Sequence, residues 1–465
     1  MKEYTLTDLI EGLNNKSFTS VELVNLYLNQ VKLYDSYLNA VSELNPDALK
    51  IAAELDQERL TKGPRSPLHG IPIFLKDNIN TKDQMHTTAN SLALSDLIAP
   101  YEATIANQLR NAGAVILGKT NLSEFAHFMS YSMPSGYGSR NGQVINPYNK
   151  KLDPLGSSTG SAVAIAANMI PVAIGTETNG SLMAPAYYNS IVSIKPTLGL
   201  VSRYGIIPIS GNQDTAGPMG KTVADCAILL DQIVGQDIND PSTLHDNHPR
   251  EFYSKAIKKS VRGMSVGIVH FSNHSYKDEE KKVLLEAKNK LGKKGVFVID
   301  IVIKSGSMNN LKSLLYEFKH DLNHYLKTVE GSTKMKSLQD IISFNQEDPE
   351  VRLKYGQTIL IDSDKTSGQL DEPKYLSIRK KLLKEANRFE DLMQKLHLDA
   401  LLSTRWSSYA PIAGNPSICV PGKPLIDLKP ISVVFVGKKF DDATLISITH
   451  AYEQATKHRI PPTLE

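Results

Sequence analysis

An apolar run followed by a turn of small polar residues is the feature that most constrains this chain. Residues 170–174 read as a buried strand, and they lead into the polar turn G-T-E-T-N-G-S. Asn179 and Gly180, two residue types that tolerate positive φ, come directly before Ser181. A backbone bent in this way can direct several N–H groups at one point and bind an anion there. The stretch predicts either a serine nucleophile beside its own oxyanion hole or an ordinary strand followed by a turn.

Strand patterns alternate with helical patterns on both sides of this turn, which predicts an α/β protein with a large mixed central sheet. The expected strands are 71–76, 114–117, 170–174, 191–195, 265–270, 296–303, 400–403, 417–421 and 431–437. The expected helices are 5–13, 19–34, 47–59, 102–111, 155–168, 222–233, 282–291, 311–326, 375–396 and 443–454. We therefore expect helices on both faces of the sheet.

The charged and mostly helical composition of the middle of the chain predicts an insertion within one compact domain. We expect N-terminal helices over 1–60, an α/β core made of 61–236 and 398–465, and a mostly helical insertion or cap over 237–397. No internal repeat or low-complexity tract interrupts this organisation.

Lys76 ends the strand pattern of the segment P-L-H-G-I-P-I-F-L-K-D-N-I. A lysine at a strand end is usually solvated. The alternative is a lysine that is desolvated by burial, whose pKa falls far enough for it to act as a base. Sequence alone leaves both interpretations open.

Two familiar motifs in the chain lack the context that they require. Residues 113–120 match the phosphate-binding pattern G-x-x-x-x-G-K-T, but a helix precedes them and four strand-forming residues separate the glycines. Residues 156–160 match the G-x-S-x-G elbow of α/β-hydrolases, with Ser158 as the nucleophile, but a charged loop stands where the elbow needs a buried strand. We assign neither nucleotide binding nor an elbow to these segments.

Charge and cysteine content exclude several classes of function. A net charge of +3 over 465 residues gives no electrostatic case for binding nucleic acid or an anionic membrane. The two cysteines, Cys226 and Cys419, make no disulfide framework and lack metal-ligand spacing. We find no signal peptide and no apolar run of about 18 residues, so we expect a cytoplasmic protein.

Lys76, Ser157 and Ser181 together resemble the Ser-Ser-Lys arrangement of the amidase signature family. The two serines lie 24 residues apart, which is the family's usual interval. The similarity covers most of 65–235 and 398–455, and the serine turns look most like the peptide-amidase branch. The matching segments are H-G-I-P-I-F-L-K-D-N-I, G-S-S-T-G-S-A, G-T-E-T-N-G-S-L, V-S-I-K-P-T-L-G-L-V-S-R-Y-G-I-I-P and G-N-Q-D-T-A-G-P-M.

The resemblance implies the amidase-signature fold and a role for each member of the triad. Ser181 would be the nucleophile, Ser157 the bridging serine and Lys76 the base, with no metal or organic cofactor. The base must be neutral, so its pKa has to fall from about 10.4 to roughly 7–8. A shift of three units corresponds to about 4 kcal/mol, which only burial or neighbouring donors can supply.

The resemblance also implies an oxyanion hole made of four consecutive backbone N–H groups, those of Thr178, Asn179, Gly180 and Ser181. The chain departs from the common pattern at three positions. Asn179 stands where the family often has Gly or Asp, Met183 where many members have Arg, and Leu155 where Gly or Cys is common. Asparagine still accepts positive φ, so we expect the hole to survive. Met183 removes a charge near the site and argues against an acidic substrate.

We expect an amide hydrolase that converts a small-molecule or short-peptide amide to an acid and an amine or ammonia. Two alternatives stay open. One is the glutamine-hydrolysing A-type subunit of a tRNA-dependent amidotransferase, and the other is a non-catalytic binding protein on the same fold. The substrate's acyl and amine parts and the oligomeric state do not follow from the sequence.

Overall fold

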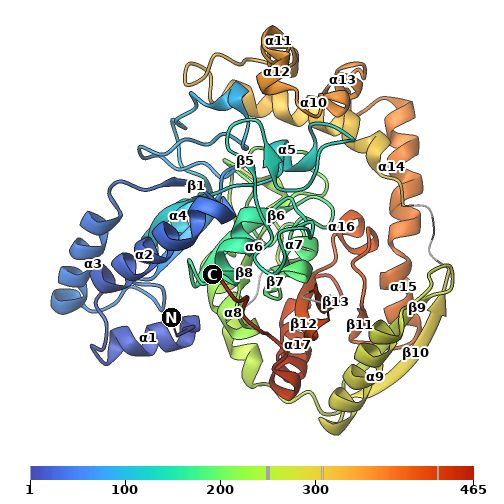
Figure 1. Cartoon of the computed structure of the whole chain (residues 1–465). Coiled ribbons are helices and arrows are strands. Elements are labelled where there is room, and N and C mark those ends of the chain that lie inside the picture. The colour runs from blue at the N-terminus through green and yellow to red at the C-terminus, as the bar shows by residue number, and fades with distance from the viewer. Residues whose placement is uncertain (1, 248–251, 305, 307, 427–428, 465) are drawn as a thin grey trace.

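The computed structural model describes residues 2–247, 252–304, 306, 308–426 and 429–464, and an 11-stranded mixed sheet forms its centre (Figure 1). This single-domain α/β architecture, with helices flanking the sheet, confirms the expected fold class. In spatial order the strands are β1 (Val41–Leu44), β3 (Val115–Thr120), β2 (Pro72–Lys76), β6 (Val172–Glu177), β8 (Thr215–Gly220), β7 (Val192–Lys195), β12 (Ser417–Ile426), β13 (Lys429–Gly437), β11 (Ala400–Ser403), β9 (Ser265–Phe271) and β10 (Phe297–Ile303). A two-stranded sheet joins β4 (Tyr137–Gly138) to β5 (Gly142–Gln143).

Each predicted helical segment contains helix, and the described residues form six further helices that the sequence pattern did not predict, over 124–127, 183–188, 338–347, 349–352, 358–364 and 409–413. The helices are α1 (Leu6–Asn14), α2 (Ser20–Leu38), α3 (Ala48–Lys62), α4 (Thr104–Asn111), α5 (Glu124–His127), α6 (Thr159–Ala166), α7 (Met183–Tyr188), α8 (Val223–Asp231), α9 (Asp278–Lys293), α10 (Leu311–Thr328), α11 (Leu338–Glu347), α12 (Pro349–Arg352), α13 (Thr358–Asp364), α14 (Pro373–Ala386), α15 (Arg388–Lys395), α16 (Tyr409–Ala413) and α17 (Asp442–Thr456). Short 3₁₀ turns occupy Leu92–Leu94, Pro241–Thr243 and Tyr253–Lys258. The single helix expected over 375–396 is instead the pair α14 and α15, which separate at Asn387.

Threonine caps fix where two of these helices start. Thr19 accepts a hydrogen bond from the N–H of Glu22 while the Glu22 carboxylate accepts one from the Thr19 N–H. Thr222 and Asp225 make the same reciprocal pair at α8. Each pair satisfies backbone donors that a helix start otherwise leaves without partners.

The candidate site lies at the ends of three neighbouring strands in the middle of the sheet. Strands β2 and β6 are parallel and end side by side at Lys76 and Glu177. Strand β8 runs antiparallel to β6, and it begins with Thr215 beside the last residue of β6. Residues at the ends of neighbouring strands project into a common space beyond the sheet, so the topology brings distant parts of the chain together here.

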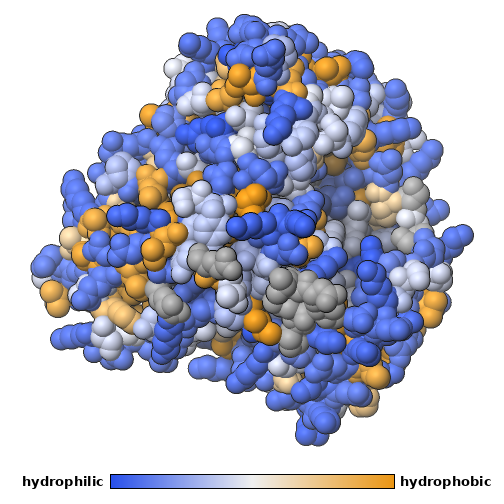
Figure 2. All heavy atoms as spheres, in the orientation of Figure 1, coloured by the Kyte–Doolittle hydropathy of each residue, from blue (hydrophilic) through white to orange (hydrophobic). Residues whose placement is uncertain are grey.

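Residues 237–397 contribute both to the sheet and to a separate group of helices. Strands β9 and β10 pair in parallel and extend the sheet beyond β11. Helices α10–α13 lie at the top of Figure 1, where Phe318 of α10 packs against the rings of Phe125 and Phe128. Hydrophilic residues cover most of the face in Figure 2, with small groups of hydrophobic residues between them.

Among the described residues, no helix combines the length and the apolar character needed to cross a bilayer. Cys226 and Cys419 are both buried and free.

Candidate active site

Lys76 is buried at the end of β2, and its ammonium nitrogen contacts two hydroxyl groups. The Nζ atom donates to Ser157 Oγ at 2.7 Å and to Thr176 Oγ1 at 2.8 Å. A longer bond of 3.3 Å runs to the carbonyl oxygen of Thr176. The side chain has no solvent exposure. Of the two interpretations of this lysine, the structure supports the desolvated one.

Burial lowers the pKa of Lys76 from 10.5 to about 7, against the opposing influence of the negative charges of Asp214 and Glu177. A charged amine loses its hydration inside the protein, so burial disfavours the ammonium form. About half of the amine is therefore neutral at pH 7 and most of it at pH 8, where it is able to accept a proton.

Ser157 is held in a tight turn, and the position directly before it has no room for a side chain. Leu155 has a φ of 53°, and the Gly156–Ser157 peptide bond is cis. A Cβ on Gly156 would lie 2.4 Å from Ser123 Oγ, so only glycine fits there. The N–H of Ser123 donates to the Ser157 carbonyl oxygen at 3.2 Å. These contacts fix the Ser157 hydroxyl beside Lys76.

Ser158 has a structural role that is incompatible with the hydrolase-elbow interpretation. Its Oγ donates to the Thr176 carbonyl at 3.0 Å and accepts from the Thr176 N–H at 3.1 Å. The side chain is fully buried. Its hydroxyl is therefore committed to joining the start of α6 to strand β6.

Ser181 lies in the turn after β6 and borders a cavity of about 290 Å³. Its side chain is 8% exposed, whereas Ser157 and Lys76 lie behind it with no exposure. The N–H of Ser158 donates to the Ser181 carbonyl oxygen at 3.2 Å, which holds the two serine turns together. Among the described residues, no hydrogen bond joins the hydroxyls of Ser157 and Ser181.

Thr178, Asn179, Gly180 and Ser181 line the same cavity, and we consider their backbone N–H groups together. Within the part of the chain that the structure describes, none of the four donates to another protein atom. Successive N–H groups left unpaired beside an accessible hydroxyl are suited to bind an anionic oxygen.

The bend in this turn comes from Gly180, with a φ of 87°, and not from Asn179, whose φ is not positive. The tolerance of asparagine for positive φ is therefore not used at this position. The asparagine contributes its side chain instead, because Nδ2 donates to Ser408 Oγ at 3.1 Å and to Asn310 Oδ1 at 3.3 Å. Asparagine tolerates positive φ but does not require it, and here tertiary hydrogen bonds decide its conformation.

Two carboxylates, the buried Glu177 and the partly buried Asp214, support the Ser181 turn, and sequence reasoning assigned neither. Glu177 Oε2 accepts from the N–H groups of Leu182 and Met183 at 2.8 and 3.2 Å. Asp214 accepts from Thr178 Oγ1 at 2.5 Å, and burial raises the pKa of Asp214 to about 6. The motifs G-T-E-T and G-N-Q-D-T-A contain both residues, but their partners become evident only in three dimensions.

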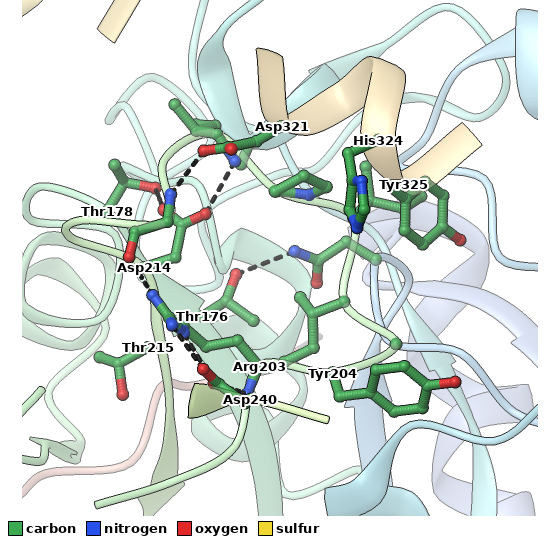
Figure 3. A pocket seen from close by; sticks show the side chains of 18 of the residues that line it. Thr176, Thr178, Arg203, Tyr204, Asp214, Thr215, Asp240, Asp321, His324 and Tyr325 are labelled. Atoms are coloured by element: carbon green, nitrogen blue, oxygen red, sulfur yellow. Dashed lines mark hydrogen bonds and ion pairs between the residues drawn. The ribbon is translucent and has the colours of Figure 1, made fainter. Parts of the chain in front are cut away.

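A second cavity of about 240 Å³ shares Thr178 with the first (Figure 3). Thr176, which contacts Lys76, lines it together with Asp214. Arg203 and Asp240 lie next to each other in its lining and form an ion pair at 2.6 Å. Of these two cavities, Ser181 lines only the first.

The phosphate-binding pattern 113–120 is largely strand β3 itself. Lys119 is fully buried, and its Nζ donates to the Ile79 carbonyl at 2.7 Å and to Thr87 Oγ1 at 3.1 Å. The amine is therefore hydrogen-bonded inside the protein and is not available to a phosphate. Across the described residues, no three His, Cys, Asp or Glu side chains gather as metal ligands would.

A buried lysine–serine contact near a serine that lines a cavity, at the ends of central strands of a mixed sheet, is the arrangement that the resemblance to serine amidases predicts. Comparison with known proteins agrees, because the Amidase family model matches residues 22–446. The chain belongs to the amidase family, and it is an amide-hydrolysing enzyme.

Individual relatives span nearly the whole chain. A probable amidase of Arabidopsis thaliana is 39% identical over 99% of this chain and 92% of its own length. The structure of native peptide amidase from Stenotrophomonas maltophilia is 40% identical, with a TM-score of 0.95 over 100% of this chain and 99% of that one. The A-type subunit of glutamyl-tRNA(Gln) amidotransferase from Coxiella burnetii is 31% identical over the full length of both.

Proposed function

We propose that this amidase hydrolyses the amide of a short peptide or similar carboxylic acid through an acyl-enzyme on Ser181. The observation that carries the proposal is the 2.7 Å contact between Lys76 Nζ and Ser157 Oγ directly behind the accessible serine. Similarity to peptide amidase supports the choice of a peptide-like substrate.

Acylation requires a proton to leave Ser181 as its Oγ attacks the substrate carbonyl carbon. Ser157 Oγ takes that proton and passes its own to the neutral Lys76 amine. The carbonyl oxygen becomes an oxyanion, and the unpaired N–H groups of residues 178–181 stabilise it.

Collapse of this intermediate breaks the C–N bond and needs the proton to return. The Lys76 ammonium gives a proton to Ser157, which protonates the departing nitrogen, so that a neutral amine or ammonia leaves. Water then attacks the acyl-enzyme with the same two proton transfers, releasing the acid and free Ser181. Lys76 must be neutral to begin each half of the cycle.

The glutamine-hydrolysing component of an amidotransferase is the second candidate function, because the relative from Coxiella burnetii is 31% identical over its entire length. It is less similar than peptide amidase at 40%. Release of ammonia from free glutamine, dependent on a second protein that co-purifies with the chain, would favour this candidate. Hydrolysis of peptide amides by the isolated chain favours the first.

Matched ester and amide substrates of one acyl group test the proton relay. An alkoxide departs with little help, whereas an amine must be protonated as its bond breaks. Lys76→Ala should therefore lower kcat/KM for the amide much more than for the ester. Equal losses on both substrates, together with a lower melting temperature, would show that Lys76 is structural.

A serine-directed fluorophosphonate locates the nucleophile independently. Mass spectrometry of the labelled chain should place the adduct on Ser181. An adduct on Ser157 or Ser158 would contradict the assignment.

A further inference from the structure

A larger cavity of about 690 Å³ adjoins the one that contains Ser181. Trp406 lines both cavities. Helix α7 also lines both, with Ala184 on the Ser181 side and with Tyr187 and Tyr188 on the other. The two cavities therefore follow one helix and share a wall.

The loop before Ser157 repeats this arrangement, because Leu155 borders the first cavity and Leu152 the second. Three separate segments of the chain thus line both cavities. We call the two cavities together the α7 groove. The second part alone has the size of a pocket that holds a drug-sized ligand.

Aromatic rings form the junction between the two parts of the groove. Trp406, the chain's only tryptophan, leaves 36% of its surface exposed. Its ring meets that of Tyr187 edge-on at 5.4 Å, and Tyr187 meets Tyr188 at 5.6 Å. A Cβ on Gly180 would lie 3.2 Å from Trp406 Cδ1, so the indole lies directly beside the nucleophile turn.

The spacing along α7 sets how long a substrate must be to use the whole groove. Ala184 and the tyrosine pair are three and four residues apart, which is about one helical turn or roughly 5.4 Å. An extended peptide advances about 3.3–3.6 Å per residue. A single acyl residue attached at Ser181 stops short of the second cavity, and the second and third residues reach it.

We propose that the α7 groove binds the acyl part of an extended peptide amide, with an aromatic or large apolar side chain of its second or third residue against Trp406 and Tyr188. This inference rests on the proposed function, since it identifies the acyl group that Ser181 accepts. The outer wall also carries charges of both signs, with Lys277, Arg405 and Lys429 against Glu279 and Glu280, and Lys429 Nζ lies 4.6 Å from the centre of the Tyr188 ring. It therefore gives an acidic or a basic acyl residue no strong advantage.

The single tryptophan allows binding to be observed without turnover. The Ser181→Ala variant is titrated with N-acetyl-Ala-NH2 and with N-acetyl-Phe-Phe-Ala-NH2 while indole emission is excited at 295 nm. The three-residue amide should change the emission and bind at least about 10-fold more tightly than the one-residue amide, because aromatic contacts add to its affinity. Emission that responds to neither peptide, or to both at the same concentration, would overturn the proposal.

Kinetics give a second, separate measurement. The ratio of kcat/KM for the three-residue amide to that for the one-residue amide should fall about 10-fold in Trp406→Ala and in Tyr188→Ala. Phe297→Ala is the matched control, since this ring is 67% exposed on the edge strand β10. It should leave the ratio unchanged.

These outcomes separate the groove from the chemistry. A wild-type enzyme that hydrolyses both amides with equal kcat/KM refutes the groove and leaves the Ser181 mechanism standing. An enzyme that hydrolyses neither amide refutes the proposed function, and the emission titration still decides whether the groove binds peptides.

Discussion

Replacing Lys76 by methionine removes a titratable group from the interior, and the pH dependence of stability should change by a calculable amount. The folded protein holds this amine with a pKa of about 7, against an ordinary value of 10.5. Between these two values the unfolded chain binds more protons than the folded one, so wild-type stability rises with pH. Below pH 7 the full destabilisation is present, at roughly 5 kcal/mol for a shift of this size.

From pH 6 to pH 9 the free energy of unfolding of the wild type should rise by about 3 kcal/mol relative to Lys76→Met. The hydrogen bonds that the substitution also removes change the difference by a constant and leave its slope intact. Denaturant unfolding of both proteins at pH 6, 7.5 and 9 measures the difference directly.

Lys195 provides a matched control in the same sheet. It is equally buried at the end of β7, and burial lowers its pKa to about 8. Lys195→Met should therefore show the same sign of pH-dependent stability, with a smaller rise of about 1.5 kcal/mol over this range. It should keep the wild-type activity profile, in which kcat/KM rises with pH through an apparent pKa near 7.

A stability difference between wild type and Lys76→Met that stays constant from pH 6 to pH 9 would refute the depressed pKa. If Lys195→Met loses the rise of activity with an apparent pKa near 7, that titration belongs to Lys195 and our assignment to Lys76 is wrong.

Three further substitutions test the two serine turns. Ser181→Ala should lower kcat by about 10³-fold or more while the melting temperature stays within experimental error, and a thermal scan beside the assay checks both. Gly180→Ala should destabilise the fold by roughly 1–2 kcal/mol because φ is 87°, and kcat/KM should fall more than this loss of stability explains. Ser158→Ala should destabilise by about 1–3 kcal/mol because the Thr176 N–H loses its partner and the Thr176 carbonyl keeps only the 3.3 Å contact to Lys76, yet fluorophosphonate should still label Ser181; loss of labelling in a folded variant would instead make Ser158 the nucleophile.

Local pattern predicted most of the fold, because apolar periodicity and helix caps act over a few residues. Strand β6 and the turn to Ser181 follow from an apolar run that ends in small polar residues. Pattern could not show that two helices, α14 and α15, replace one, since no glycine or proline marks the boundary at Asn387.

The candidate site shows the same division between local and distant determinants. Lys76 and Ser157 are 81 residues apart, and only the order of strands in the sheet places one beside the other. The family resemblance named both, whereas Thr176 and Asp214 became evident from their hydrogen bonds. Trp406 carried no sequence signal, because a lone exposed tryptophan has no periodicity to detect.

The hydrogen bond from Asn179 to Ser408 also has a consequence for the chain during its synthesis. These residues lie 229 positions apart, so a ribosome adding about 5–20 residues per second needs roughly 10–50 s to pass from one to the other. Strands β1, β2, β3, β6, β7 and β8 are complete by residue 220 and can pair during that interval. The turn that presents Ser181 gains its last anchor only with the C-terminal strands, and we expect the nascent enzyme to stay inactive until they emerge.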